Sequence, residues 1–219
     1  ATAHATMSCL HFGLVPPQRC EPARRWLLAN CEKENISPYA YQLLLEEIYR
    51  ADTDQADREV LDLVRKRWGP MAQGETGTVW EAFGPSENCH EAGAVPAYFL
   101  SAYVLGVRLD EPVTDKRLII EPHLGNLPHA AGVVVTEHGP VPVSWTRAAT
   151  GVSLDFTFEV PTGIQARLSL PRLGEKAQIR LDGRPIDPTT LTSRGRWMDL
   201  EVGAGKHSGR ISVHAAEGS

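Results

Sequence analysis

The spacing of apolar residues changes once along the chain, and this change constrains the fold more than any other feature. Up to about residue 107, apolar side chains recur every three or four residues, as they do between Tyr41 and Ile48, which is the period of a helix face. From residue 116 onward they alternate with polar ones, as they do between Val152 and Phe158, which is the period of a strand. The sequence therefore predicts an α+β protein with a helical domain over 1–115 and a β domain over 116–219.

The helical domain is predicted to contain five helices. Their expected bounds are 2–13, 21–33, 39–51, 55–67 and 92–106. The segment from Trp68 to Glu91 contains several glycines and two prolines without a sustained period, which predicts a long ordered loop. Loops of this length inside a compact domain are often functional.

Five helices in a single layer would leave one side of that layer without a partner. Three arrangements remain open. The helices form a compact bundle with the β domain as a lid, they dimerise with a second copy, or an N-terminal part of a longer protein completes a larger helical array.

The β domain is predicted to be an antiparallel sandwich. Eight short strands are expected at 117–121, 131–135, 141–145, 152–158, 164–170, 178–181, 197–202 and 209–213. Asp182-Gly183 marks a tight turn. Many short strands with regular turn signals favour a sandwich.

Charge and apolar content exclude two classes of partner. The net charge of −5 comes from 27 acidic and 22 basic residues spread along the chain, so no basic stripe attracts nucleic acid. The longest apolar stretch, 93–107, is shorter than the roughly 20 residues that cross a bilayer. We expect neither nucleic acid nor a membrane as a partner.

The cysteines and the opening residues bear on the compartment. No two of the four cysteines form a C-x-x-C pair, which argues against a zinc knuckle and a disulfide framework. We expect them to be small buried residues, which favours a reducing, cytoplasmic location. The opening residues show no secretory signal. The four cysteines are Cys9, Cys20, Cys31 and Cys89.

The segment 74–93, GETGTVWEAFGPSENCHEAG, is the strongest candidate for a site. Trp80-Glu81 places an aromatic face, which packs on a sugar ring, beside a carboxylate, which transfers protons. Without further context, a glutamate in such a loop is more often a solvated or helix-capping residue. His90-Glu91 begins like a zinc-protease motif, but Ala94 stands where the second histidine is required. The residues around Ser86 lack the closing glycine of a nucleophile elbow.

Histidines gather with glutamates at the start of the β domain, but we assign them no site. The spacing of His123, His129 and His138 relative to Glu121 and Glu137 matches no metal-ligand pattern, so we expect exposed loop histidines. Residues 203–206, GAGK, lack the spacing of a phosphate loop and predict a turn between strands. We expect no metal and no cofactor.

Several segments, in this order, resemble the C-terminal region of bacterial α-L-rhamnosidases. They are AHATMSCLHFGLVP (3–16), ISPYAYQLLLEEI (36–48), RKRWGPMAQGETGTVWEAF (65–83), NCHEAGAVPAYFLSAYVLGV (88–107) and LIIEPHLGNLPHAAGVVVTEHGPVPVSW (118–145). The resemblance implies five of the twelve helices of an (α/α)6 toroid, followed by a β-sandwich. It also implies inverting hydrolysis of terminal α-L-rhamnosides.

The resemblance implies three site residues. In the family, a Gly- and Thr-containing element ends in Trp-Glu, and this glutamate is the general base. The element matches Gly74 through Glu81, so the resemblance implies that Glu81 is the base. Trp80 would flank the sugar. The family's sugar-contacting histidine falls on His90.

Two departures from the family matter. Related sequences often place Gly-Trp after the histidine, where this chain has Glu91-Ala92, so the resemblance implies no aromatic wall at this point of the pocket. The family's general acid lies upstream of these residues, so we expect the isolated chain to have little or no activity. The alternative function is a non-catalytic carbohydrate-binding or structural accessory module.

Overall fold

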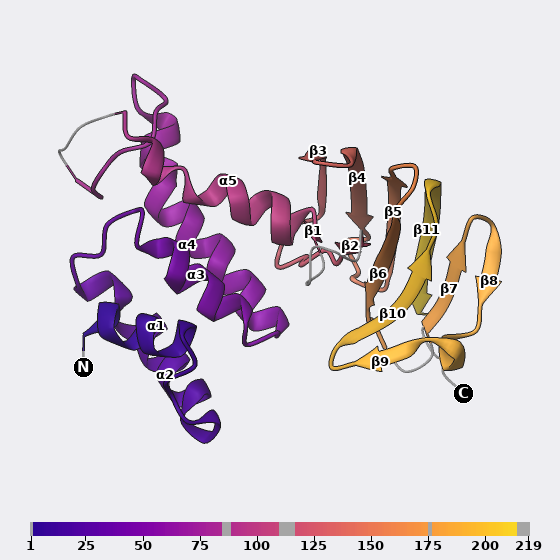
Figure 1. Ribbon diagram of the computed structural model, residues 1–219, viewed down its shortest axis with the longest axis horizontal. Coiled ribbons are helices and arrows are strands. Elements are labelled where there is room, and N and C mark those ends of the chain that lie inside the picture. Colours follow the sequence, from indigo (N-terminus) through magenta and orange to yellow (C-terminus); the bar gives the residue numbers. More distant parts are fainter. Residues whose placement is uncertain (1, 85–88, 110–116, 175–176, 214–219) are drawn as a thin grey trace. The chain divides into compact units, whose positions relative to one another are not determined.

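The chain divides into two compact units. The computed structural model describes residues 2–84, 89–109, 117–174 and 177–213. The units are Ala1–Phe99 and Leu100–Ser219, the first helical and the second built of strands (Figure 1). The predicted domain boundary between residues 115 and 116 lies outside the described residues. The observed division, between Phe99 and Leu100, falls inside the last predicted helix, 92–106.

Helix α3, Tyr41–Tyr49, is central in the first unit. It packs against α1, Ala3–His11, α2, Pro17–Asn30, α4, Asp54–Gln73, and α5, Val95–Phe99. Its Tyr41, Leu44 and Leu45 are fully buried, because residues spaced by three and four share one helix face. Short 3-10 turns follow α2 and precede α5, at Cys31–Lys33 (η1) and Glu91–Gly93 (η2). Each of the five predicted helices has a counterpart, the first four with shifted ends and the last shortened to α5.

Helix α4 is longer than predicted. Thr53 caps its start, because the Thr53 hydroxyl accepts a hydrogen bond from the backbone N–H of Ala56 at 3.1 Å, and the helix continues through Pro70 to Gln73. The prediction that the loop begins at Trp68 is therefore wrong. Trp68 and Met71 are buried, so the packing of this last turn outweighs the cost of a proline inside a helix.

The last predicted helix, 92–106, is not one regular helix. After α5 comes a π-helical turn, Leu100–Val104 (η3), which belongs to the second unit. Gly106 follows two residues after this turn, with a φ of 82° that favours glycine, and a Cβ added there would collide with the backbone of Glu121. The Nε1–H of buried Trp145 donates to the carbonyl of Val104 at 2.9 Å, which satisfies the end of the helix.

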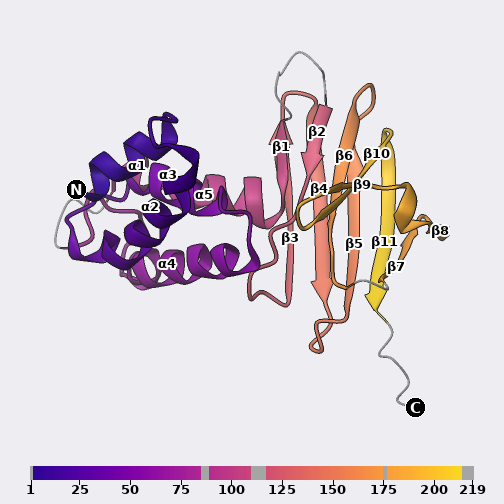
Figure 2. The same ribbon diagram turned by 90° about the horizontal axis from the view of Figure 1, so that it is seen from below.

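Two sheets build the second unit (Figure 2). The five-stranded sheet has the order β1-β2-β6-β10-β9, with bounds Val107–Leu109, Arg117–Ile120, Gln165–Pro171, Trp197–Val202 and Thr192–Arg194. The six-stranded sheet has the order β3-β4-β5-β11-β7-β8, with bounds His129–Thr136, Gly139–Arg147, Ser153–Val160, Gly205–Val213, Ala177–Leu181 and Arg184–Ile186. A 3-10 turn, Pro188–Thr190 (η5), precedes β9.

The alternation of apolar residues places one face of each sheet in a common core. Trp145, Leu154 and Phe158 are buried from the six-stranded sheet, and Leu118, Leu168 and Trp197 are buried from the five-stranded sheet. Asp182 and Gly183 both have positive φ, at 51° and 76°, in the two-residue turn between β7 and β8. The predicted sandwich and this turn are confirmed. Of the turn predicted over 203–206, only Gly203 and Ala204 connect the two strands, because β11 begins at Gly205.

The sheets are not purely antiparallel as predicted. β2 pairs with β6 in parallel, because the chain leaves the first sheet after β2, forms β3, β4 and β5 in the other sheet, and returns as β6. Three further strands, β1, β8 and β9, were not predicted. Each has three residues, which is too short for an alternating pattern to be recognised.

The four cysteines are free. Cys31 is buried as predicted, Cys9 and Cys20 are half-buried, and Cys89 is exposed, so the prediction of burial is wrong for Cys89. In the described part of the chain, no helix combines the length and the apolar composition that crossing a membrane requires.

Candidate functional site

A single backbone contact brings the three predicted site residues into one loop region. The N–H of His90 donates to the carbonyl of Val79 at 3.0 Å, so His90 lies across the loop from Trp80 and Glu81. Gly93 packs so closely that a Cβ added there would lie 2.5 Å from the carbonyl oxygen of Trp80. The Nε1–H of Trp68 donates to the carbonyl of Gly93 at 2.7 Å and fixes this side of the loop to α4.

An aromatic cluster holds the other side of the loop, just beyond Glu81. The ring of Phe83 meets Tyr41 and Trp68 edge-on, with ring centroids 5.0 and 4.9 Å apart. The guanidinium of Arg67 lies 4.9 Å from the centroid of the Phe83 ring, and its Nε–H donates to the Tyr41 hydroxyl at 3.0 Å. Burial raises the pKa of Tyr41 to about 12, although the charge of Arg67 acts in the opposite direction. The Tyr41 hydroxyl therefore stays protonated at neutral pH.

Anchored on both sides, the loop presents a carboxylate next to an indole. The side chain of Glu81 is exposed, and Trp80 and His90 are half-buried. Among the described residues, none forms an ion pair with Glu81, and none accepts a hydrogen bond from the buried Nε1–H of Trp80. An unpaired carboxylate can take up a proton from a water molecule, and an unpaired indole N–H can donate to a ligand.

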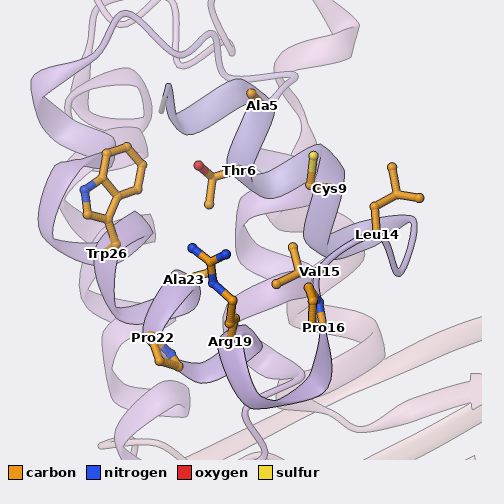
Figure 3. A pocket seen from close by; sticks show the side chains of 10 residues that line it. All are labelled: Ala5, Thr6, Cys9, Leu14, Val15, Pro16, Arg19, Pro22, Ala23 and Trp26. Carbon is orange, nitrogen blue, oxygen red and sulfur yellow. The ribbon is translucent and has the colours of Figure 1, made fainter.

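A separate cavity of about 500 Å³ lies between α1 and α2 (Figure 3). Its lining is mostly apolar, with the guanidinium of Arg19 and the hydroxyl of Thr6 as polar groups. Neither Trp80, Glu81 nor His90 lines it. The residues around it are Ala5, Thr6, Cys9, Leu14, Val15, Pro16, Arg19, Pro22, Ala23 and Trp26.

The prediction of exposed loop histidines is wrong for His123. His123 and Glu121 are 3% and 5% exposed. The Glu121 carboxylate accepts hydrogen bonds from Arg108, at 2.5 Å, and from Arg194, and it lies 3.4 Å from Nε2 of His123. Burial alone would raise the pKa of Glu121, but His123, Arg108 and Arg194 hold it well below its usual range.

This cluster ties strands together rather than forming a site. Arg108 lies on β1, Glu121 follows β2 and Arg194 lies on β9, and the Nδ1 of His123 accepts a hydrogen bond from Arg196 at 2.9 Å. Of the other two histidines, His129 is exposed, and His138 lies 3.5 Å from Glu137. No group of His, Cys, Asp and Glu residues within the described ranges could hold a metal ion. Ser86 lies outside the described residues.

Sequence reasoning missed the two groups of residues that position the loop and the strands. The members of the aromatic cluster, Tyr41, Trp68 and Phe83, are far apart in the sequence. The one available signal was Trp68, which continues the apolar face of α4 beyond Val64. The arginines that surround Glu121 are equally distant in the sequence.

The comparisons with known proteins agree with this architecture. Residues 106–180 match the bacterial alpha-L-rhamnosidase C-terminal domain. The structure of alpha-L-rhamnosidase from Dictyoglumus thermophilum matches with a TM-score of 0.82 and 17% identity, over 97% of this chain and 25% of that chain. That of Streptomyces avermitilis alpha-L-rhamnosidase complexed with L-rhamnose matches with a TM-score of 0.76 and 21% identity, over 97% of this chain and 22% of that chain.

No curated protein shows significant sequence similarity to the chain. The chain spans about a quarter of the length of the two solved rhamnosidases. Residues 106–180 are thus similar in sequence to the C-terminal domain of bacterial α-L-rhamnosidases, and the chain has the fold of the C-terminal region of the two solved proteins.

Proposed function

We propose that the chain is the C-terminal part of an α-L-rhamnosidase-like glycoside hydrolase, which in its intact form hydrolyses terminal α-L-rhamnosides with inversion. The observation that carries this proposal is the fold shared, over 97% of the chain, with two solved α-L-rhamnosidases, one of them complexed with L-rhamnose. The match includes the helical unit, which holds Trp80, Glu81 and His90.

Glu81 acts as the general base in this proposal. An inverting glycosidase uses two carboxyl groups about 6.5–9.5 Å apart, one to protonate the leaving oxygen and one to deprotonate the attacking water. The exposed carboxylate of Glu81 takes the proton of that water. Trp80 packs against the sugar ring, and His90 donates a hydrogen bond to a sugar hydroxyl.

The general acid and the other wall of the pocket come from the rest of the enzyme. Loss of one acid–base group lowers a rate by a factor of about 10² to 10⁴, and loss of half a pocket removes binding as well. The isolated chain is therefore nearly or completely inactive. The partner that the helical unit needs is the N-terminal part of the same enzyme.

Hydrolysis of an aryl α-L-rhamnoside tests the role of Glu81. The assay uses a polypeptide in which this chain is joined to its N-terminal part. We expect Glu81→Gln to lower kcat by about 10² to 10⁴-fold, since the amide cannot take up the proton. The control is Glu75→Gln, an exposed residue of the same loop, which should leave the rate unchanged. Equal rates for the wild type and Glu81→Gln would remove Glu81 from the mechanism.

The second candidate function is a non-catalytic carbohydrate-binding module. It is favoured by a groove across the six-stranded sheet, which has no residue in common with the loop around Glu81. The two candidate functions predict different results in the rhamnoside assay. A purely binding protein hydrolyses nothing, whether or not Glu81 is replaced.

A further inference from the structure

A row of small hydroxyl side chains crosses the outer face of the six-stranded sheet. Ser144 on β4 pairs with Thr157 on β5, and Thr157 pairs with Ser208 on β11. These three strands lie side by side (Figure 2). Since neighbouring strands are about 4.8 Å apart, the row extends about 10 Å across the sheet. We call it the hydroxyl row.

Larger side chains border the hydroxyl row on both sides. On one side stand Asp155, Arg210 and Arg180, which are consecutive cross-strand partners on β5, β11 and β7. On the other side, Glu159 pairs with Lys206, and Pro142 and Val133 continue toward β3. Two hollows of about 420 and 670 Å³ result, and Ser144, Thr157 and Ser208 line both. The hollows therefore join along the hydroxyl row into one groove, the sheet groove.

The floor of the sheet groove offers free hydrogen-bonding groups. Within the part of the chain that the structure describes, the side-chain hydroxyls of Ser144, Thr157 and Ser208 bond to no other protein group. Thr157 and Ser208 are exposed, and Ser144 is half-buried. Each hydroxyl can donate one hydrogen bond and accept others, which suits a ligand that carries hydroxyl groups itself.

One wall of the sheet groove carries an excess of positive charge. Arg180 and Arg210 stand directly opposite each other, an arrangement that weakens strand pairing. Arg210 forms an ion pair with Asp155 at 3.1 Å, but no described residue forms one with Arg180. Arg180 donates only to the carbonyl of Gly183, at a long 3.4 Å. A guanidinium with free N–H groups binds a carboxylate through two parallel hydrogen bonds.

We propose that the sheet groove binds an acidic oligosaccharide. The hydroxyl row binds the sugar hydroxyls, and Arg180 binds a uronate carboxylate. Val133, which is 57% exposed, and Pro142 contact the apolar face of a sugar ring at the other end of the groove. This site goes beyond the proposed hydrolysis, because all its residues lie in the second unit and none is near Glu81 in the sequence.

Calorimetric titration of the full 219-residue chain tests the proposal. The probes are tetrasaccharides of mannuronate, guluronate and galacturonate, together with the same saccharides after reduction of their carboxyl groups to alcohols. We expect at least one acidic probe to bind, and its reduced form to bind at least about tenfold more weakly, since a charge-assisted pair is lost. The proposal would be overturned if no acidic probe binds, or if the acidic and reduced forms bind equally well. It would also be overturned if the chain binds acetate as tightly as it binds the acidic tetrasaccharide.

Substitutions then locate the site. We expect Arg180→Met to weaken binding of the acidic probe at least about tenfold, and Thr157→Phe to abolish it by filling the hydroxyl row. Arg184→Met is the matched control, because this arginine on the neighbouring β8 lines neither hollow, and it should bind as the wild type does. Binding that survives both Arg180→Met and Thr157→Phe would overturn the proposal. Glu81→Gln should bind normally, so a failure here is distinguishable from a failure of the rhamnosidase proposal.

Discussion

Glu81 and Glu121 represent two opposite environments for a carboxylate. Glu81 is exposed and has no ion-pair partner among the described residues, whereas Glu121 is buried among Arg108, Arg194 and His123. The sequence resemblance found the first, because a short segment carries it. It could not find the second, because three-dimensional packing alone brings the arginines of β1 and β9 to Glu121.

The environment of Glu121 predicts how stability depends on pH. The folded structure depresses the pKa of Glu121 below its ordinary value of 4.5. The residue therefore stabilises the fold fully above pH 4.5, and this contribution is lost as the pH falls toward the lower folded-state pKa. We expect the free energy of unfolding of the second unit to fall below pH 4.5, and Glu121→Gln to reduce this dependence. The measurement is urea unfolding between pH 3 and 7.

Glu121→Gln should also destabilise the second unit at pH 7, by about 2 kcal/mol, since Arg108 and Arg194, which are 18% and 42% exposed, lose charge-assisted hydrogen bonds to a buried carboxylate. Glu201→Gln is the control. Glu201 is 54% exposed and lies 3.3 Å from Arg117, and an exposed pair of this kind contributes at most about 1 kcal/mol. Losses of equal size for the two variants would show that the Glu121 cluster contributes no more than a surface ion pair.

At the scale of elements, periodicity predicted which segments are helices or strands, but not where they end or which strands pair. Alternation shows which face of a strand is buried, and both parallel and antiparallel neighbours satisfy it, so the β2–β6 pair was missed. The end of α4 was misplaced because Gly69-Pro70 resembles a stop signal. Burial of Trp68 and Met71, which depends on tertiary contacts, extends the helix past it.

Replacing two glycines with alanine tests the close contact at Gly106 and the helical assignment of Gly69. Gly106 has positive φ and no room for a Cβ against Glu121, so Gly106→Ala should destabilise the second unit by about 2 kcal/mol or more. Gly69 lies inside α4 with open space around its Cα, so Gly69→Ala should stabilise the chain by up to about 1 kcal/mol. Thermal unfolding of both variants checks the opposite signs. A stabilising Gly106→Ala would contradict the close contact, and a destabilising Gly69→Ala would contradict the helical assignment.

For the whole molecule, the change in period correctly predicted a helical half and a β half. It could not place the boundary, since the turn η3 is helical in pattern yet belongs to the second unit. Nor could it complete the candidate site, because the hydrolysis proposed above needs a second carboxyl group, and the sequence resemblance assigns that role to no residue of this chain. The two solved rhamnosidases are about four times as long as the matched region.

The division into two units predicts two separable responses to core substitutions. Leu45 in α3 and Leu168 in β6 are 0% and 1% exposed, and each lies in the core of its own unit. Replacing either with alanine removes buried methyl groups and should cost about 2–5 kcal/mol. We expect Leu45→Ala to lower amide hydrogen-exchange protection in α3 and α4 and leave β5 and β11 unchanged, and Leu168→Ala to do the reverse. If each variant lowers protection equally in both units, they unfold as one cooperative body, and stability measured for the chain cannot be assigned to either unit alone.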